Sequence, residues 1–586
     1  MRHKLIWLFL GIIVFLASCE APETKEISIL ETTDLHGVIL PWDFIENREL
    51  DASLAVTAGY VRELRRSKDA VFLLDNGDNL QGQPIVYYYN FIDTISPHIL
   101  SEAMNWMEYD ACTAGNHDIE AGHSVYDRLV GELECPLLAA NAVDIETGSP
   151  YFEPYVIIEK ENIKVAVLGM VTPSVPTWLP EELYSGIEFR DMVETAELWM
   201  PEIKKQKPDI IVGLFHSGWN TENENYKSED SFYDDGTSAV AWKVEGFDII
   251  FCGHDHNPTN EKFVNSKGDT LLILNGGSRS EFIARADITV TSKGLFERTV
   301  KTMSGELIRV DQFEPDPDFT ANFEEHKKTV KEYVSREIGY MAETITSRDS
   351  YFGSSAFTDM IHSIQLDITG ADISFAAPLS FDVNIPKGPV TVGDMFKLYR
   401  YENMLYTMSL TGEEILSYLE YSYSRWFNTM AGPDDYLLKY RTDNNGNPVL
   451  TNGRAWLSSP SYNFDSAAGI EYTVDVSKTE GNRINIGSFT DGRPFELQKE
   501  YKVAINSYRG SGGGGHLTSG AGIEQEKLRA RLIKSTDRDL RYYMLKTIEE
   551  KKSISPEPEN NWKIIPEKWV NKRVPEEKIL LFGTTK

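Results

Sequence analysis

Side chains that can bind metal ions directly follow the short apolar runs in the first half of the chain. In chain order they are Asp34, His36, Asp78, Asn116, His117, Asp118, His216, His254 and His256. Ligands of an open α/β sheet bind outside the carboxyl ends of its strands, so we expect these groups to meet at one sheet edge. Imidazole and carboxylate are ligands of Zn, Mn and Fe ions, and the groups are too many for one ion. A carboxylate shared by two ions would give a two-metal site, and such a site can activate water and clamp a phosphoryl group.

The apolar runs predict the strands that position these groups. They cover residues 26–33, 70–77, 109–115, 164–170, 209–215, 247–253 and 271–277. The runs are apolar on both faces, as expected for a sheet that is covered by helices on each side. The sequence therefore predicts a layered α/β domain. A single histidine at a strand end is more often structural, but the ordered series favours a metal site.

Length, charge and cysteine content restrict the remaining possibilities. At 586 residues the chain is too long for one core, which predicts at least two domains. The formal charge of −32 argues against a nucleic-acid polymer as partner, because binding a polyanion needs a basic surface. It is compatible with divalent cations. Cys112, Cys135 and Cys252 lie in apolar, strand-like surroundings, so we expect buried free thiols.

The N-terminus has the pattern of a secretory signal. A basic start is followed by an apolar stretch over residues 5–16 and by the sequence LASC, which ends at Cys19. This ending is similar to the lipobox of bacterial lipoproteins, so residues 1–19 are predicted as a signal peptide and Cys19 as the lipidation site. A simple cleaved signal with an incidental cysteine is the alternative. We expect an exported lipoprotein, periplasmic or at the cell surface, that contacts the membrane only through this anchor.

The second half of the chain predicts another α/β region. Apolar residues at helical spacing in 313–339 predict one amphipathic helix that bridges two domains. Residues 411–426 open with a capping box and predict a helix. Residues 551–586 mix charge with proline and predict an extended tail packed through Trp562 and Trp569. Strand patterns lie at 371–378, 404–410, 470–477 and 501–508.

Five motifs in this order resemble those of the calcineurin-like metallophosphoesterases. They are TTDLHG (32–37), DNGDNLQG (75–82), GNHD (115–118), the histidine of LFHSG (214–218) and GHDH (253–256). The two-domain layout is similar to the 5′-nucleotidase family, and the motifs SFAAP, YNFDSAAGI and NSYRGSGGGG extend the similarity over residues 27–530. TTDLHG, SYF, SFAAP and SYNFD are most similar to the 2′,3′-cyclic-nucleotide 2′-phosphodiesterase/3′-nucleotidase branch. True 5′-nucleotidases more often have an amide at the position of His256.

The resemblance implies a fold and a division of the chain. An N-terminal four-layer αββα metallophosphoesterase domain would cover residues 25–312, followed by the linker helix 313–339. A C-terminal α/β substrate-binding domain would cover residues 340–550, followed by the tail.

The resemblance also implies two divalent metal ions, of Mn, Zn, Fe or Co. One ion would be held by Asp34, His36, Asp78 and His256, and the other by Asp78, Asn116, His216 and His254, with Asp78 bridging them. His117 would not be a ligand but would face the phosphate, where it stabilises negative charge or protonates the leaving oxygen. Its partner would be the acid three residues on, which is Glu120 here and usually Asp in the family. Asp118 is the alternative partner.

In this family the second domain supplies a nucleoside pocket, in which a base stacks between two aromatic side chains. Here the resemblance implies Tyr462 and Tyr508, with Phe464 as a competitor for the first place. A single tyrosine is more often a packing residue, and the glycine run after Tyr508 can also be a flexible loop. Segments 350–357 and 374–380 lack the phosphate-binding arginines of many 5′-nucleotidases, and Gly514 stands where a ribose-binding Asp often occurs.

These features predict a two-metal hydrolase of phosphate esters of extracytoplasmic nucleotides. The leading interpretation is a 2′,3′-cyclic-nucleotide 2′-phosphodiesterase/3′-nucleotidase, because the missing arginines and Asp weaken a 5′-monophosphate assignment. A 5′-nucleotidase that releases nucleosides is the alternative. A non-catalytic surface binding protein is a third possibility, and the intact ligand set argues against it. The identity of the metal and the oligomeric state stay open.

Overall fold

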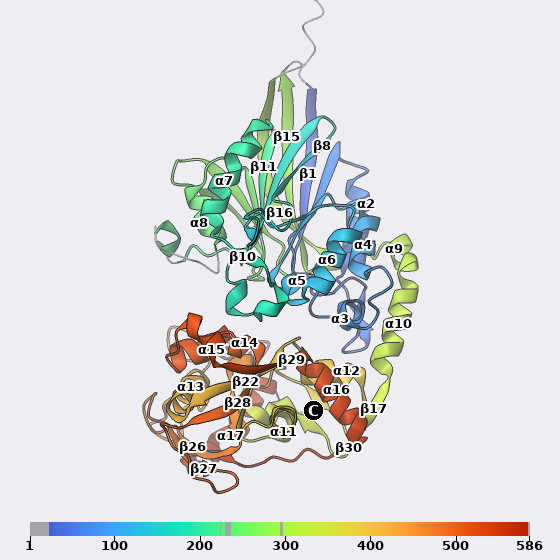
Figure 1. Ribbon diagram of the computed structural model, residues 1–586. Helices are drawn as coiled ribbons and strands as arrows, with labels where there is room; N and C mark the ends of the chain where they lie inside the picture. Colours follow the sequence, from blue (N-terminus) through green and yellow to red (C-terminus); the bar gives the residue numbers. More distant parts are fainter. Residues whose placement is uncertain (1–22, 223, 229–235, 294–296, 584–586) are drawn as a thin grey trace, which may run out of the picture. The chain divides into compact units, whose positions relative to one another are not determined.

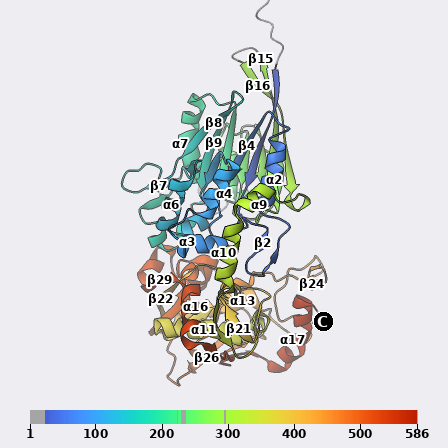
Figure 2. The same ribbon diagram turned by 90° about the vertical axis from the view of Figure 1, so that its right-hand side faces the viewer.

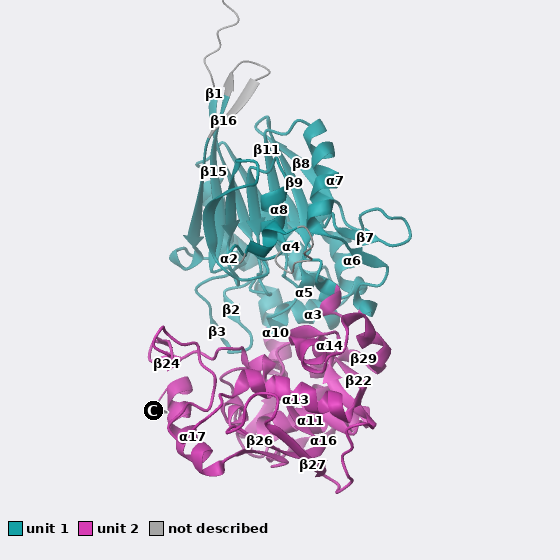
Figure 3. Ribbon diagram, turned by 90° about the vertical axis from the view of Figure 1, so that its left-hand side faces the viewer, with its two compact units in different colours: residues 1–175, 181–330 teal, residues 176–180, 331–586 magenta. Residues whose placement is uncertain are grey.

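The computed structural model describes residues 23–222, 224–228, 236–293 and 297–583. The chain divides into two compact units, one of Met1–Val175 and Glu181–Val330 and the other of Pro176–Pro180 and Lys331–Lys586 (Figure 3). The predicted signal peptide and Cys19 lie outside the described residues. Within the described part of the chain, no helix is both long enough and apolar enough to cross a bilayer.

Two six-stranded sheets form the centre of the first unit (Figure 1). One has the strand order β16-β15-β1-β4-β5-β6, with β1 (Glu23–Thr32), β4 (Ala70–Asp75), β5 (Ala111–Thr113), β6 (Leu137–Leu138), β15 (Phe282–Lys293) and β16 (Glu297–Arg309). The other has the order β13-β14-β12-β11-β9-β8, with β8 (Tyr155–Lys160), β9 (Ile163–Val171), β11 (Ile210–His216), β12 (Ile249–Cys252), β13 (Thr259–Val264) and β14 (Thr270–Asn275). Central strands pair in parallel, and the edge pairs β1–β15, β15–β16, β8–β9 and β13–β14 are antiparallel.

Apolar residues on both faces of the central strands build two cores. On β9, Val165 and Val167 belong to the core between the sheets, whereas Ala166 and Leu168 pack against the helices outside. The same alternation holds on β11 and β12, because successive side chains of a strand point to opposite faces. The predicted four-layer αββα arrangement is confirmed.

Helices cover the outer face of each sheet, and this arrangement can be followed in both Figure 1 and Figure 2. Over the second sheet lie α7 (Met192–Lys205) and α8 (Thr237–Lys243). The remaining helices are α2 (Leu54–Leu64), α3 (Pro84–Phe91), α4 (Ile99–Met107), α5 (Asn116–Glu120) and α6 (His123–Glu132). Two short ladders complete the unit, β2 (Trp42–Asp43) with β3 (Arg48–Glu49) and β7 (Ala142–Asp144) with β10 (Ile187–Phe189). Cys112, Cys135 and Cys252 are buried, as expected, and their thiols are free in this structure.

The single helix expected over residues 313–339 is found as two, α9 (Pro317–Asn322) and α10 (Glu324–Ser335). Phe323 interrupts them with φ −101° and ψ 9°, outside the helical region. Asp316 caps α9 by accepting the backbone N–H groups of Asp318 and Phe319. The prediction of one continuous helix was therefore wrong, since helical spacing of apolar residues does not reveal a break at one of them.

The second unit is built around a mixed five-stranded sheet of order β25-β19-β28-β22-β29. Its strands are β19 (Ile373–Ala376), β22 (Met404–Thr411), β25 (Ser466–Ala468), β28 (Glu500–Asn506) and β29 (Leu532–Asp539). Smaller ladders join β17 (Glu337–Met341), β21 (Gly388–Thr391) and β30 (Ser553–Ile554); β18 (Ile345–Thr346) and β20 (Asn384–Ile385); β23 (Leu450–Thr451) and β24 (Arg454–Ala455); and β26 (Ile470–Asp475), β27 (Ile484–Phe489) and β31 (Trp562–Ile565).

The helices of this unit include the one that the capping box predicts. In α13, the Thr411 hydroxyl accepts the N–H of Glu414 at 3.2 Å, and the Glu414 carboxylate accepts the N–H of Thr411 at 2.8 Å. The helices are α11 (Ala356–Thr369), α12 (Val392–Leu398), α13 (Gly412–Trp426), α14 (Ser507–Gly510), α15 (Leu528–Arg531), α16 (Leu540–Lys551) and α17 (Glu567–Phe582).

The C-terminal segment is not an extended tail, so that part of the prediction was wrong. Trp562 is buried as expected and lies on β31, which pairs in parallel with β26. The next residues form α17, whose Glu577 is fully buried. The Glu577 carboxylate accepts the N–H groups of Leu437 and Leu438 and the hydroxyl of Tyr440. These bonds make the segment part of the core of the second unit.

Candidate metal centre

The predicted ligands follow the carboxyl ends of the parallel strands and converge there. Asp34, His36 and His256 form one group of ligand atoms, and Asp78, His216 and His254 form a second; within each group the atoms lie no more than 4.8 Å apart. Asn116 joins the second group, because its side-chain oxygen is 3.2 Å from Nε2 of His216. The structure thus brings all seven predicted ligands together, from segments more than 200 residues apart in the chain.

The backbone is strained where these side chains leave their strands. Positive φ angles of 49–73° are found at Asp34, His36, Asp78, His254 and His256. Such left-handed conformations cost about 1–3 kcal/mol each in a non-glycine residue and persist only where the surroundings enforce them. Two backbone bonds do so here, from Asp34 N–H to the carbonyl of Gly77 and from His36 N–H to the carbonyl of Asp78. Strain concentrated on proposed ligands indicates a functional site.

The glycine of the GNHD motif is required by a close approach. A side chain at Gly115 would collide with the carboxylate of Asp78. Asp118 fastens the same segment, since its carboxylate accepts the N–H groups of Gly115 at 2.8 Å, Asp78 at 2.9 Å and Asn79 at 2.9 Å. Asp118 therefore positions the Asp78 loop.

The donor set fits metal ions. His36 and His216 direct Nδ1 at backbone carbonyls, those of Gln81 at 3.0 Å and Asn76 at 2.6 Å. A carbonyl oxygen only accepts, so each Nδ1 carries a proton and each Nε2 is turned to the centre, where a metal ion would displace any proton that it holds. The Nε2 of His36 faces the Nε2 of His256 at 3.1 Å, and the Nε2 of His216 lies 3.1 Å from a carboxylate oxygen of Asp78. Lone pairs that converge on one another are satisfied by a cation.

Burial and charge act in opposite directions on the central groups. Burial alone would raise the pKa of the Asp78 carboxyl, but the charges of His216 and His117 outweigh it and hold that pKa well below the usual value. Burial lowers the pKa of His36 to about 4, so its imidazole is neutral at physiological pH. An ionised carboxylate and a neutral imidazole are the forms that bind a divalent ion.

His117 lies beside the donor groups without belonging to either. Its Nδ1 is 2.5 Å from the carboxylate of Glu120, and its Nε2 is 4.0 Å from that of Asp78. The side chain is 26% exposed, so the ring can meet a bound molecule. Glu120 thus spans the gap that an Asp would span in the family, and it is the carboxylate that orients His117.

Comparison with known proteins identifies both halves of the chain. Residues 27–258 match the calcineurin-like phosphoesterase family, and residues 335–519 match the 5′-nucleotidase C-terminal domain. The chain has an N-terminal metallophosphoesterase domain and a C-terminal 5′-nucleotidase domain. Calcineurin-like phosphoesterases are metal-dependent hydrolases of phosphate esters, and the paired donor groups are the candidate sites for divalent ions.

Relatives extend the likeness over most of the chain. It is 28% identical to a trifunctional nucleotide phosphoesterase of Bacillus subtilis (strain 168) over 93% of this chain, although it spans only 39% of that relative. It is 25% identical to a 2′,3′-cyclic-nucleotide 2′-phosphodiesterase/3′-nucleotidase of Haemophilus influenzae, over 94% of this chain and 89% of the relative. A solved structure described as a candidate 5′-nucleotidase of Staphylococcus aureus has the same fold, with a TM-score of 0.74, 22% identity and coverage of 92% and 100%.

In the nucleotidase C-terminal domain, the structure separates the three aromatic candidates. Tyr462 and Tyr508 are half-buried. Phe464 is fully buried and stacks on Trp426, with ring centroids 5.0 Å apart and 8° between the planes. Phe464 is therefore a core residue, and its place among the base-stacking candidates was wrong. Its neighbour in the sequence, Tyr462, has the exposure that a stacking residue needs.

Arg509 connects the two tyrosine-bearing segments, and the sequence did not reveal this role. Its buried guanidinium donates to the Asp465 carboxylate at 2.6 Å, to the carbonyl of Gly513 at 3.1 Å and to the carbonyl of Tyr462. A side chain at Gly514 would collide with this guanidinium, and Gly514 has φ +71°. The glycine run is thus a built loop closed over Arg509, rather than a flexible one.

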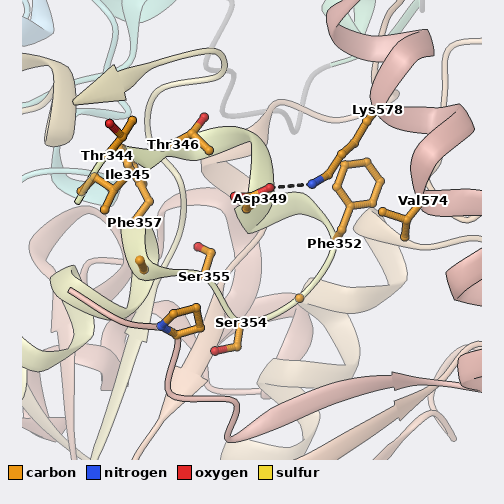
Figure 4. Close-up of a pocket in the computed structure, with 13 residues that line it drawn as sticks. Thr344, Ile345, Thr346, Asp349, Phe352, Ser354, Ser355, Phe357, Val574 and Lys578 are labelled. Atoms are coloured by element: carbon orange, nitrogen blue, oxygen red, sulfur yellow. Dashed lines mark hydrogen bonds and ion pairs between the residues drawn. The ribbon is translucent and has the colours of Figure 1, made fainter. Parts of the chain in front are cut away.

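The segment 350–357, which lacks arginine, lines a cavity of about 370 Å³ (Figure 4). Phe352, Ser354 and Ser355 lie along it, and Lys578 of α17 reaches it from the C-terminal segment. Lys578 donates to Asp349 at 2.5 Å, so its charge is already balanced within the cavity wall. No arginine is among the residues that line this cavity, in agreement with the sequence of the segment.

Proposed function

We propose that the protein hydrolyses phosphate esters of extracytoplasmic nucleotides as a 2′,3′-cyclic-nucleotide 2′-phosphodiesterase/3′-nucleotidase. The observation that carries this proposal is the pair of donor groups, centred on Asp34 and Asp78, beside the partly exposed imidazole of His117. The cyclic-nucleotide branch is supported by the relative of that name, which is matched over nearly its whole length. It is also supported by His256 among the donors and by the arginine-free segment 350–357.

The chain's own residues divide the chemistry between them. Two bound ions would supply the positive charge that polarises a phosphoryl group and activates water. Asp78 lies where both could share its carboxylate, and Asn116 and His216 fix its surroundings. Glu120 accepts the Nδ1 proton of His117, which leaves Nε2 turned to the substrate side as the group that gives a proton to the leaving oxygen.

Replacing His117 by alanine is expected to lower kcat by about 10²–10⁴-fold on nucleotides, the usual contribution of a general acid. The loss should be much smaller with a p-nitrophenyl ester, because p-nitrophenolate departs without protonation. Glu120→Gln should show the same dependence on the leaving group with a smaller loss, since only the orientation of the imidazole is weakened. Steady-state kinetics on both substrate types measure this. Equal losses on both would exclude the proton-donor role.

A substrate panel tests the assignment itself. We expect the purified protein, loaded with Mn²⁺ or Zn²⁺, to hydrolyse 2′,3′-cyclic AMP and 3′-AMP with at least tenfold higher kcat/KM than 5′-AMP, a difference of about 1.4 kcal/mol in transition-state binding. A preference for 5′-AMP would instead support the second candidate, a 5′-nucleotidase. That candidate is favoured by the family of residues 335–519 and by the fold of the staphylococcal structure. Absence of both bound metal and activity would support the non-catalytic binding protein.

We further propose that the chain acts outside the cytoplasm as a lipoprotein anchored through Cys19. The basic start, the apolar stretch and the LASC ending of residues 1–19 support this location. An anchored phosphoesterase would meet nucleotides released outside the cell membrane, and its net charge of −32 keeps nucleic-acid polymers away from its surface. The domain limits 25–312 and 340–550 remain part of this proposal.

A further inference from the structure

Two buried cysteines of the phosphoesterase domain are in contact. Cys112 lies in β5, and Cys135 lies two residues before the start of β6. Their sulfur atoms are 3.3 Å apart, and the residues are only 2% and 8% exposed. The third described cysteine, Cys252, is on β12 of the other sheet, where its thiol donates to the carbonyl of Leu274.

The sheet holds the two sulfurs at this spacing. Strands β5 and β6 are parallel neighbours, with Cys112 opposite Leu137, and the N–H of Cys112 donates to the carbonyl of Pro136 at 3.0 Å. Cys135 lies in the bend that leads into β6, and the bond to Pro136 keeps this bend beside Cys112. A disulfide needs a sulfur separation of about 2.05 Å, so the two sulfur atoms, now 3.3 Å apart, must move closer for the bond to form.

We propose that Cys112 and Cys135 are joined by a disulfide in the mature protein. The inference rests on the proposed export, because a compartment outside the cytoplasm supplies the oxidant. That oxidant is a disulfide of a thiol–disulfide exchange protein. One cysteine sulfur attacks it to give a mixed disulfide, the other displaces the carrier, and the carrier leaves as a dithiol with the two electrons and two protons.

The bond forms before this layer of the domain closes. The Cys112 thiol packs 3.5 Å from the sulfur of Met104 on α4, away from solvent. The hydrogen bond to Cys135 together with burial raises the pKa of the Cys112 thiol well above its usual value, which suppresses the reactive thiolate. A folded, reduced chain is therefore slow to oxidise, whereas an emerging chain is not.

The disulfide would close a loop that carries part of the metal centre. Between the two cysteines lie α5 and α6, and α5 contributes Asn116, His117 and Glu120. Closing this loop removes conformations from the unfolded ensemble and stabilises the folded domain. It also ties the segment that presents His117 to the edge of the sheet.

Peptide mapping of the exported full-length chain tests the proposal. The chain is recovered from the membrane fraction, denatured without reductant, alkylated and digested. We expect Cys252 to be alkylated, and Cys112 and Cys135 to appear as one linked pair that separates on reduction. Alkylation of both Cys112 and Cys135 in the exported chain would overturn the proposal of a disulfide. A chain found only in the cytoplasm would overturn the export proposal and the disulfide with it.

Thermal unfolding provides a second readout that does not depend on activity. Reductant should lower the Tm of the wild-type protein by about 5 °C or more, given the loop length and the size of the domain. The double variant Cys112→Ala/Cys135→Ala should show no shift with reductant. An equal shift in both proteins would contradict the assignment to this pair, and peptide mapping decides the matter if the double variant does not fold.

Discussion

Replacing Asp78 by alanine is expected to abolish hydrolysis, with a loss of kcat/KM on the order of 10⁴-fold or more. Asp78 belongs to the second donor group, 3.1 Å from Nε2 of His216, and its carboxylate also interacts electrostatically with His36 of the first group. Removing it takes away the negative charge that two cations would share. Metal analysis should show the loss of at least one ion per chain.

The fold should survive this change, and Asp78→Asn is the matched control. Asp78 has φ +58°, a conformation that asparagine tolerates better than alanine does. The amide oxygen can still accept the N–H of His117, which donates to the Asp78 carboxylate at 2.7 Å. We therefore expect Asp78→Asn to be as inactive as Asp78→Ala but more stable by about 1 kcal/mol. Activity is measured on the three nucleotides and stability by thermal unfolding. Wild-type rates in either variant would exclude the two-metal scheme.

The proposed metal ligands could be predicted from the sequence because each stands at a recognisable place. A buried strand leaves a run of apolar residues, and the polar residue that ends the run marks the ligand edge. His216 directly ends the run of β11, and His254 follows the run of β12 after one glycine. The resemblance of the motifs then predicted which group would serve which ion. The αββα layers followed from the same runs, since both faces of each strand are apolar.

The partners of these ligands could not be read in the same way. His36 and His216 are oriented by the carbonyls of Gln81 and Asn76. Every residue has a carbonyl, so no side-chain identity signals this role. The left-handed backbone conformation at Asp34 and His256 could not be predicted from the sequence either, because neighbouring loops impose it. Tertiary contact, and not local sequence, decides these features.

In the nucleotidase C-terminal domain the sequence misled for identifiable reasons. Phe464 stands two residues after Tyr462, and only the structure shows that its ring enters the core against Trp426. The C-terminal segment contains Pro575, which argues against a helix, yet Pro575 lies inside α17. The bonds of the buried Glu577 to residues 437–440 stabilise that helix from outside.

Replacing Asp465 by asparagine is expected to destabilise the nucleotidase C-terminal domain by about 3–5 kcal/mol, because it leaves the buried charge of Arg509 without its partner. Both side chains are nearly inaccessible to water, and Asp465 also accepts the hydroxyl of Tyr418 at 2.6 Å. Since Arg509 holds the carbonyl of Tyr462 and borders Tyr508 in the chain, the loss should also disturb the proposed base-stacking pair. KM for nucleotides should rise about tenfold or more.

The acid stability of the domain should change in the same variant. Burial alone would raise the pKa of Asp465, but Arg509 and His516 outweigh it, so the folded-state pKa lies below the ordinary value. A carboxyl with a lowered folded-state pKa contributes stability that is present above its unfolded pKa and is lost as pH falls through the folded value. Wild-type stability should therefore fall below about pH 4. Asp465→Asn should lack this part of the acid transition, as denaturant unfolding at pH 3 and pH 7 would reveal.

A double-mutant cycle separates the ion pair from mere packing. Arg509→Met removes the guanidinium, and the combined variant Arg509→Met/Asp465→Asn leaves no unpaired charge in the core. If the pair acts as inferred, the combined variant should be less destabilised than the sum of the single variants by about 1–3 kcal/mol. The combined variant should still bind nucleotides weakly, because the new Met and Asn side chains do not connect Tyr462 to the loop after Tyr508. Additive losses would mean that the two side chains act independently. Wild-type KM in the combined variant would mean that Arg509 does not position the stacking residues. In either case kcat should stay near the wild-type value, since the donor groups around Asp78 belong to the other unit of the chain.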